Sequence, residues 1–272
     1  MPSKQRTGPL IVLSVAGYDP SSGAGVTADI KTIAAHGCYA VTCITALTVQ
    51  STQGVKRFET VDTRIIAESL EELETDFDLA AIRVGMLGSS EAARAVAAFI
   101  RRHEFSNVVL DPVLKSSSGM PLISRDGEQI LREKLLPLVD VITPNIDEAS
   151  AFTGLHVSNV DEMRTAALQL HRMGAKNVII TGGHLDVPVD LVSMGRPAEI
   201  KLLEGEKIRG RSTHGTGCAF ATSLACNLAR GHNLADAAKA AKSYVASAMR
   251  SAVPMGKGAG PLNHLISPAR SK

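Results

Sequence analysis

The segment with the clearest chemical potential lies near the C-terminal end of the chain, at residues 211–218, Arg-Ser-Thr-His-Gly-Thr-Gly-Cys. It leads into an alanine-rich stretch, residues 219–230, whose composition is typical of a buried helix. The first turn of a helix has unpaired backbone N–H groups and a partial positive charge, so it binds phosphate or a developing oxyanion. The junction therefore predicts an anion hole, although its pattern is equally compatible with a glycine turn before a core helix.

Four residues of this junction could act on a bound anion. Gly215 and Gly217 let the backbone approach a phosphate closely, and Thr216 lies between them with its own N–H group. Cys218 falls in the first helical turn, where the helix field would favour its thiolate. We therefore predict that Cys218 is a polarised nucleophile or base beside the anion hole.

Polar and glycine-rich residues also follow the other predicted strands, at the place where open parallel sheets bind their ligands. Residues 17–25, Gly-Tyr-Asp-Pro-Ser-Ser-Gly-Ala-Gly, follow the first strand and open a helix that carries Asp29. The loop is neither a Walker A motif nor Gly-x-Gly-x-x-Gly, because no Gly-Lys-Ser/Thr closes it and its glycine spacing differs. It favours a ligand close to the backbone, but it is also compatible with a plain helix N-cap turn.

Side chains at the next two strand ends are candidates for contacts with a ring. Gln50 follows Thr48 after the second strand, and its amide could hydrogen-bond the edge of a heteroaromatic ring, although such residues are more often solvated. Met86 follows the third strand and could pack against a ring, although most buried methionines simply belong to the core.

Three further residues favour a metal and a phosphate at neighbouring strand ends. Asp111 ends the fourth strand, while Asn145 and Glu148 follow the fifth strand, one helical turn apart on the same face. The two carboxylates are typical ligands of Mg²⁺, whereas Asn145 by itself could be only an N-cap. Residues 181–183, Thr-Gly-Gly, follow the sixth strand and offer another close approach of the backbone to a ligand. Together these sites indicate phosphoryl transfer.

The elements that must position these residues are visible as short β-branched runs that alternate with amphipathic segments. Such an alternation predicts a parallel sheet with helices on both faces. The predicted strands are residues 10–16, 41–47, 80–84, 107–111, 138–142 and 177–181; the predicted helices are residues 25–36, 63–73, 90–103, 127–136, 145–152 and 160–173, and two that begin at 216 and 233. Residues 189–211 predict a small antiparallel meander of three segments, the last at 207–209. We predict one domain over residues 10–266, between a short polar lead (1–9) and a polar tail (267–272).

Composition excludes several function classes. The 272 residues carry a net charge of +2 with no basic block, and they include no Trp, 3 Tyr and 6 Phe, so binding to nucleic acid or to an anionic membrane has little support. No apolar run of membrane-spanning length and no signal-peptide pattern occurs. The four cysteines, at 38, 43, 218 and 226, have no metal-like spacing and are expected to be reduced, which favours the cytoplasm.

Seven collinear segments carry a resemblance to a known family: residues 16–32, 44–50, 84–87, 110–113, 142–149, 182–185 and 214–218. In this order they resemble the ribokinase-like superfamily, and within it most closely the hydroxymethylpyrimidine/phosphomethylpyrimidine kinases of thiamine biosynthesis. The resemblance runs from about residue 10 to about residue 265, which is nearly the whole chain. It implies a three-layer α/β/α sandwich with a mostly parallel sheet, and an activity that uses ATP and Mg²⁺ to phosphorylate hydroxymethylpyrimidine and then its monophosphate.

The resemblance also implies a role for each candidate residue. It assigns the pyrimidine to Gly17, Ala24, Asp29, Thr48, Gln50 and Met86. It assigns the nucleotide to Asn145, Thr181, Gly183, Thr213 and Lys115, and the metal to Asp111 and Glu148. Cys218 occupies the position of the catalytic base, beside the N–H groups of Gly215, Thr216 and Gly217. By analogy with such relatives a homodimer is expected.

Two departures from the family pattern bear on these assignments. Tyr18 stands where Thr or Ser is usual, and Thr181 stands where a Lys is frequent, so a cation near the phosphates is missing unless another residue supplies it. Lys115, in the Ser/Gly-rich segment 115–121, is our candidate for that cation on a mobile lid. A pyridoxine/pyridoxal kinase of the same fold, or a pyrimidine-binding relative without catalysis, remains an alternative; Cys218 disfavours a sugar kinase.

Overall fold

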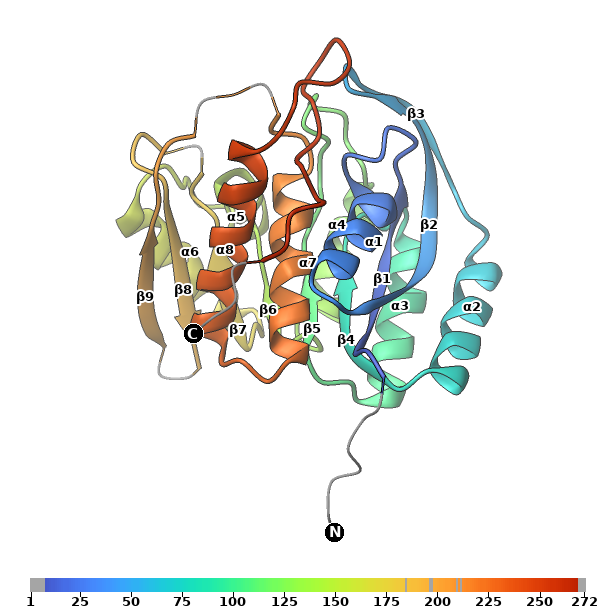
Figure 1. Ribbon diagram of the computed structural model, residues 1–272. Coiled ribbons are helices and arrows are strands. Elements are labelled where there is room, and N and C mark those ends of the chain that lie inside the picture. The colour runs from blue at the N-terminus through green and yellow to red at the C-terminus, as the bar shows by residue number, and fades with distance from the viewer. Residues whose placement is uncertain (1–7, 184, 196–197, 209, 211, 269–272) are drawn as a thin grey trace.

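A computed structural model describes residues 8–268, except 184, 196–197, 209 and 211, and its centre is a nine-stranded sheet (Figure 1). The strand order is β3-β2-β1-β4-β5-β6-β7-β8-β9. The strands are β1 (Ile11–Tyr18), β2 (Tyr39–Ser51), β3 (Gly54–Thr60), β4 (Leu79–Val84), β5 (Val108–Leu110), β6 (Val141–Ile142), β7 (Asn177–Ile180), β8 (Val189–Met194) and β9 (Glu199–Glu204). Pairing from β2 to β7 is parallel, and β3, β8 and β9 are antiparallel to their neighbours.

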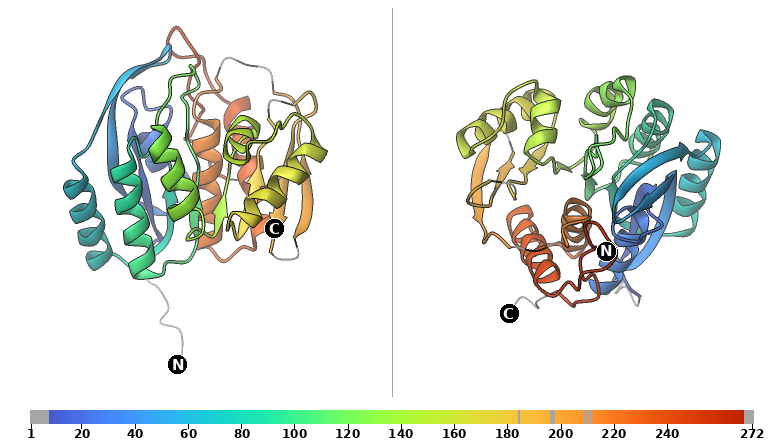
Figure 2. Two further views of the ribbon diagram at one scale, coloured as in Figure 1. Left: turned by 180° about the vertical axis from the view of Figure 1, so that it is seen from behind. Right: turned by 90° about the horizontal axis from the view of Figure 1, so that it is seen from above.

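Helices cover both faces of the sheet, which confirms the predicted three-layer sandwich (Figures 1 and 2). One layer consists of α1 (Gly25–Ala35), α7 (Thr216–Ala229) and α8 (Leu234–Arg250). The other consists of α2 (Thr63–Asp76), α3 (Ser90–His103), α4 (Arg125–Ile130), a short π-helix (Leu131–Leu135), α5 (Ile146–Thr153) and α6 (Val160–Arg172). Among the described residues, none of these helices combines the length and the apolar character needed to cross a membrane.

The two faces of the central strands supply two separate cores. On β1, Val12 belongs to the cluster beneath α7 and α8, while its neighbour Leu13 belongs to the cluster beneath α2, α3 and α6. On β4, Ala81 and Ile82 divide in the same way. Side chains alternate between the faces of a strand, so a strand buried on both faces has a continuous apolar sequence. That is why these strands are visible in the sequence.

Three predicted elements differ from the structure. The second strand is longer than predicted, and it turns back into β3, which the sequence analysis missed because five of its seven residues are polar or glycine. Residues 207–208 are not a strand, so the antiparallel end of the sheet consists of β8 and β9. The predicted helix 127–136 is the shorter α4 followed by the π-helix.

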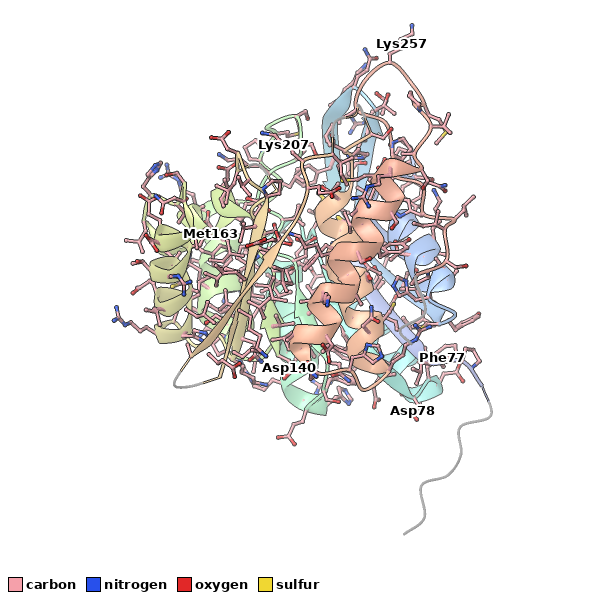
Figure 3. All side chains as sticks on the ribbon, turned by 60° about the vertical axis from the view of Figure 1, so that its left-hand side comes forward. Phe77, Asp78, Asp140, Met163, Lys207 and Lys257 are labelled. Carbon is pink, nitrogen blue, oxygen red and sulfur yellow. The ribbon has the colours of Figure 1, made fainter. Side chains whose placement is uncertain are left out.

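The carboxyl ends of the parallel strands and their loops lie together at one edge of the sheet, at the top in Figure 1. The tip of the β2–β3 hairpin meets residues 253–260 there, since the N–H group of Gly258 donates to the Thr52 hydroxyl over 3.2 Å. Figure 3 shows Lys207 and Lys257 at this edge, whereas Phe77, Asp78 and Asp140 lie at the opposite one. The candidate residues of the sequence are therefore gathered on one side of the molecule.

Candidate active site

Two glycine-rich loops meet at the centre of this edge. Gly215 is the N-cap of α7 and has a φ of 82°, which favours glycine. A Cβ atom at Gly215 would collide with the carbonyl oxygen of Gly23, so the loop before α7 lies directly against the loop before α1. Neither helix has an acidic residue in its first turn. The positive ends of two helices therefore lie close together, which favours an anion there.

Cys218 lies between these two helix ends, but its thiol is not polarised toward the thiolate. Its sulfur accepts the N–H group of Gly25 at the start of α1. Burial raises the pKa of the Cys218 thiol to about 12, against an opposing effect of the Arg83 guanidinium. The prediction that the helix field favours a thiolate is therefore wrong for this structure: desolvation outweighs the field, and Cys218 is a neutral thiol near pH 7.

Beneath the anion hole lies a fully buried guanidinium that the sequence analysis missed. Arg83, on β4, has no exposed surface; it donates from Nη1 to Asp29 over 3.0 Å and from Nη2 to Asp111. The Arg83 side chain passes so close to Gly85 that a Cβ atom at this position would collide with the guanidinium. Nearby carboxylates raise the pKa of Arg83 although burial opposes them, so the group stays charged. A buried charge of this kind is tolerated only when it is paired.

Asp29 belongs to this buried network and not to the surface of a substrate pocket. Its carboxylate accepts hydrogen bonds from the Ser14 hydroxyl and the Thr222 hydroxyl, each 2.6 Å long, in addition to the bond from Arg83. It has no exposed surface. The predicted direct contact between Asp29 and a substrate is therefore corrected to a supporting role through Arg83.

A second carboxylate that the sequence analysis did not single out, Asp19, holds the loop before α1. It accepts N–H groups from Ser21, Gly23 and Ala24 at 2.8–3.1 Å and pairs with His214 Nε2 at 2.9 Å. Burial acts to raise the pKa of Asp19, but these hydrogen bonds, led by that of His214, lower it overall. The N–H group of Ala24, a predicted substrate contact, is therefore already used. An Asp that directly follows a strand and precedes such a loop is the signal that could have identified Asp19.

The predicted pyrimidine side of the site lies next to this pair. The Gln50 amide lies 3.1 Å from His214 Nε2, and the Thr48 hydroxyl donates to the carbonyl of Tyr18 over 2.9 Å. Nearby, Met86 is buried and packs directly on Gly17, where a Cβ atom would lie only 2.8 Å from its sulfur. Met86 forms a small apolar cluster with Ala46 and Leu122, which Val55, Phe58 and Val113 extend. The structure thus brings a polar amide and an apolar surface together beside the anion hole.

Asp111 and Glu148 lie beside each other at the ends of β5 and β6. Asn145 and Glu148 form a capping box at the start of α5, in which the side chain of each accepts the N–H group of the other over 2.9 Å. Burial, and then the charge of Asp111, raise the pKa of Glu148 to about 8. Burial likewise raises the pKa of Asp111, although Arg83 opposes this. Asn145 is thus the N-cap of α5, which was the plain alternative to its predicted nucleotide contact, and that contact stays a prediction.

This carboxylate pair fits a magnesium ion bound together with phosphates. Within the described part of the chain no group of three or more His, Cys, Asp or Glu side chains could hold a metal by itself. Mg²⁺ typically uses only one or two protein carboxylates and completes its octahedron with water and substrate phosphates. Burial raises the pKa of both acids, and the charge of Asp111 adds to this at Glu148, so a divalent cation would stabilise the pair as anions.

The predicted nucleotide residues lie in two places: Asn145, Thr181 and Gly183 follow β6 and β7, whereas the loop that begins at Lys115 packs against the β2–β3 hairpin on the pyrimidine side. Thr181 forms a parallel bridge with Asn145, and Gly183 is exposed beyond it. Thr213 and Lys115 are also exposed; Lys115 bridges Pro121 at the base of a folded loop. A cavity of about 490 Å³ lies between residues 51–56 and residues 118–120 of that loop. Arg211 lies outside the described residues.

Comparison with known proteins adds independent information. The family model described as phosphomethylpyrimidine kinase matches residues 19–263. The hydroxymethylpyrimidine/phosphomethylpyrimidine kinase of Haemophilus influenzae is 40% identical over 258 residues, which cover 93% of this chain and 96% of that protein. The thiamine biosynthesis bifunctional protein ThiED of Geobacter sulfurreducens is 41% identical and is covered over 52% of its length, so the chain spans about half of that relative.

Solved structures agree with the sequence matches. The phosphomethylpyrimidine kinase of Clostridium difficile has a TM-score of 0.78 and 33% identity, covering 88% of this chain and 99% of that chain. An ADP complex of Bacillus subtilis pyridoxal kinase has a TM-score of 0.85 and 32% identity, covering 94% and 98%. The predicted ribokinase-like fold is confirmed by these likenesses together with the sheet order.

Proposed function

Because the chain belongs to the phosphomethylpyrimidine kinase family, we propose that it transfers the γ-phosphoryl group of ATP to the alcohol of hydroxymethylpyrimidine. The same site then phosphorylates the monophosphate to the diphosphate, a reaction of thiamine biosynthesis. One observation carries the proposal: the N-termini of α1 and α7 converge on Cys218, next to the carboxylates of Asp111 and Glu148. An anion hole beside paired acids is what phosphoryl transfer requires, because its catalysis consists of positioning and charge stabilisation.

In this proposal each part of the reaction has its own place. The pyrimidine ring lies against Met86, and Gln50 hydrogen-bonds its polar edge. The alcohol oxygen attacks the γ-phosphorus while the bond to the β-phosphate oxygen breaks, and the N–H groups of Thr216 and Gly217 receive the developing charge. Cys218, a neutral thiol in this structure, orients the alcohol, and the alcohol proton passes to an oxygen of the transferred phosphoryl group. Positioning contributes more than basicity for such a group.

Asp111 and Glu148 would hold the magnesium ion of the nucleotide. When bound, Mg²⁺ neutralises phosphate charge and orients the transferred group. The Arg83 guanidinium keeps Asp111 in place from below, so that the other carboxylate oxygen faces Gly217. Asn145 and residues 181–183 form the adjoining wall for the nucleotide, together with Thr213 and Lys115.

The test is an ADP-release assay with purified protein, ATP and Mg²⁺ over four acceptors: hydroxymethylpyrimidine, its monophosphate, pyridoxine and ribose. We expect turnover on both pyrimidines and the highest kcat/KM on one of them. A protein that binds hydroxymethylpyrimidine but releases no ADP would be the relative without catalysis. Release of ADP on ribose alone would contradict the proposal.

Pyridoxal phosphorylation is the second candidate activity, and the likeness to the Bacillus subtilis pyridoxal kinase favours it. The apolar surface of Met86 and the Gln50 amide suit a substituted pyridine as well as a pyrimidine. We place this activity second because the family match and the curated relatives are pyrimidine kinases. A kcat/KM on pyridoxal above that on hydroxymethylpyrimidine would reverse the order.

We further propose that residues 10–266 act as one kinase domain and that the protein is a homodimer, by analogy with related kinases. Light scattering coupled to size-exclusion chromatography measures the mass of the particle directly. A mass of one chain at micromolar concentration contradicts the dimer but leaves the catalytic proposal intact.

A further inference from the structure

The turn proposed to receive the nucleotide is held unevenly, because Gly182 is buried and its carbonyl accepts the N–H group of Leu185 over 3.0 Å, whereas Gly183 is exposed. Gly182 and Gly183 follow β7, and at Gly183 no neighbouring atom lies within 4 Å of the position of a Cβ. Two consecutive glycines leave a backbone free to adopt many conformations. The bond from Leu185 holds the carbonyl side of Gly182, so a further group must fix the direction of its N–H group if the turn is to receive a phosphate or a base in one geometry.

That group is Asp190 on the neighbouring strand β8. Its Oδ1 atom accepts the N–H group of Gly182 over 3.0 Å. The carboxylate is nearly inaccessible, with 7% of the side chain exposed, and a buried carboxylate is costly unless it is paired. A single N–H group does not neutralise the charge of the Asp190 carboxylate, so the hydrogen bond between Asp190 and Gly182 depends on a nearby cation.

The cation is Lys242, on α8. Its ammonium donates to Asp190 Oδ2 over 2.8 Å, so both carboxylate oxygens are engaged, one by the turn and one by the helix. Its stem runs over Gly205, where a Cβ atom would lie 2.7 Å from the Lys242 Cε atom. One chain of hydrogen bonds thus joins the turn and the following strand to a helix residue that lies 52 positions after Asp190 in the sequence. Thr181, directly before the turn, carries no charge that could do the same.

We propose that Lys242 is a positioning residue for the nucleotide: through Asp190 it fixes the turn of Gly182 and Gly183 in the conformation that receives ATP. The inference rests on the proposed kinase function. Lys242 does not touch the phosphates in this role; its charge holds Asp190, and Asp190 holds the N–H group of Gly182. Loss of the charge should therefore weaken nucleotide binding and leave binding of the pyrimidine alcohol unchanged.

The experiment compares Lys242→Met with Lys239→Met in the full chain. Lys239 is exposed on the same helix three residues earlier, so its substitution removes an equal charge without touching Asp190. Titration calorimetry with ADP and Mg²⁺, and steady-state kinetics with ATP, give the readouts. We expect Lys242→Met to raise the Kd of ADP and the KM of ATP about tenfold, with kcat at saturation and the KM of hydroxymethylpyrimidine within twofold of the wild type. Lys239→Met should match the wild type.

The double variant Asp190→Asn/Lys242→Met separates positioning from direct phosphate contact. Asn keeps an oxygen for the N–H group of Gly182 but needs no cation, so the KM of ATP should return to within about threefold of the wild type. If Lys242 instead contacts a phosphate, the double variant stays as weak as Lys242→Met, and the inference is overturned. Unchanged ADP binding in Lys242→Met overturns it as well.

Hydrogen exchange of the segment around Gly182 gives a readout independent of activity. Without ligand, amide exchange there should be at least tenfold faster in Lys242→Met than in Lys239→Met. If Lys242→Met does not fold, Lys242→Arg provides the alternative: it keeps the charge and should retain most ADP affinity, whereas a loss as large as tenfold contradicts the inference. If the wild-type protein binds ADP but does not phosphorylate the pyrimidine, the proposed function is refuted. The role of Lys242 in nucleotide binding can still be tested in that case, because ADP affinity is measured separately.

Discussion

In the proposed mechanism Cys218 contacts the reacting alcohol directly, so its neutral thiol makes a specific prediction. Cys218→Ala removes the group that orients the alcohol, which should lower kcat by about 10²-fold, the usual effect of losing one preorganised polar group. The KM of ATP should stay within twofold. Cys218→Ser keeps a hydroxyl in the same place and should recover part of the rate. Steady-state assays on hydroxymethylpyrimidine measure all three; unchanged turnover in Cys218→Ala removes Cys218 from the chemistry.

Arg83 is the residue on which the stability of the site depends. Arg83→Met leaves the carboxylates of Asp29 and Asp111 buried without their cation, and breaking a buried pair in this way costs about 3–5 kcal/mol of the free energy of unfolding. Arg57→Met is the matched control, because Arg57 pairs with Glu59 at the surface and should contribute less than about 1 kcal/mol. Urea denaturation measures both. Equal losses in the two variants would mean that the buried network contributes no stability.

Among single residues, the sequence identifies site residues that directly follow a strand, but it does not identify residues such as Arg83 that form buried ion pairs below the site. Asp111, Glu148 and Cys218 could be identified because strand ends and helix starts are visible in the pattern of residues. Arg83 lies inside a strand, and its partners come from α1 and from the end of β5, so the pairing exists only after the sheet is assembled. Asp29 was placed in the substrate pocket for the same reason.

At the scale of elements, the anion hole depends on how closely the loops before α1 and α7 approach each other. Gly215→Ala should disrupt it, because the added Cβ atom would collide with the carbonyl oxygen of Gly23 and the φ of 82° is strained for alanine. Gly231 offers a control at the other end of α7: its φ is 83°, and no atom lies within 4 Å of an added Cβ.

We expect Gly215→Ala to lower kcat/KM by at least about 10²-fold, since small displacements at a positioned site have effects of that size. Gly231→Ala should cost only about 1 kcal/mol of stability, from its backbone strain, and leave kcat/KM within twofold. Denaturation curves and kinetics on the same preparations separate the two effects. Equal kinetic losses in both variants would contradict the role of loop contact.

The packing of α1 against α7 also predicts how stability depends on pH. His36, at the C-terminal end of α1, accepts or donates a 2.9 Å hydrogen bond with Ser223 on α7, and burial lowers the pKa of His36 to about 4. The unfolded chain binds that proton near pH 6.5, so the contribution of neutral His36 is complete above pH 6.5 and is lost as the pH falls toward 4.

Between pH 7 and pH 5 the loss for His36 should be about 2 kcal/mol of the free energy of unfolding. His264, whose pKa burial also lowers to about 4, should contribute a similar amount. Urea denaturation at the two pH values measures the sum, and His36→Gln should roughly halve the difference. A pH dependence that His36→Gln leaves unchanged would show that His36 is not buried as a neutral group.

Elements buried on both faces are predictable from the sequence, and elements at the rim are not. The central strands have continuous apolar runs, whereas β3 alternates polar and apolar residues at the edge of the sheet, with Lys56, Arg57 and Glu59 exposed. Its pairing with β2 depends on a turn at residues 52–53 that no strong turn dipeptide marks. The loop before α7 could be identified by its glycines, but its contact with the loop before α1 could not.

At the scale of the whole molecule, the strand order separates the two substrates. The proposed pyrimidine contacts come from β1, β2 and β4; of the proposed nucleotide contacts, Asn145, Thr181 and Gly183 follow β6 and β7, whereas Lys115 follows β5 and Thr213 precedes α7. Asp111 follows β5, which lies between the two groups, and the N-terminus of α7 lies over the same place. In the proposed arrangement the acceptor and the donor would approach the transfer point from different parts of one edge of a continuous sheet.

This arrangement predicts that each ligand stabilises the protein without the other. A ligand at about 100 times its Kd adds about 2.7 kcal/mol to the free energy of unfolding, which corresponds to roughly 5–10 °C in Tm for a chain of this size. Thermal unfolding should therefore shift with ADP and Mg²⁺ alone and with hydroxymethylpyrimidine alone, and the two shifts should add when both are present, because their contacts come from different strands. Lys242→Met should diminish the nucleotide shift only. If the pyrimidine shifts Tm only after the nucleotide is bound, the acceptor side is not formed in advance, and closure of the β2–β3 tip or of residues 115–121 must build it.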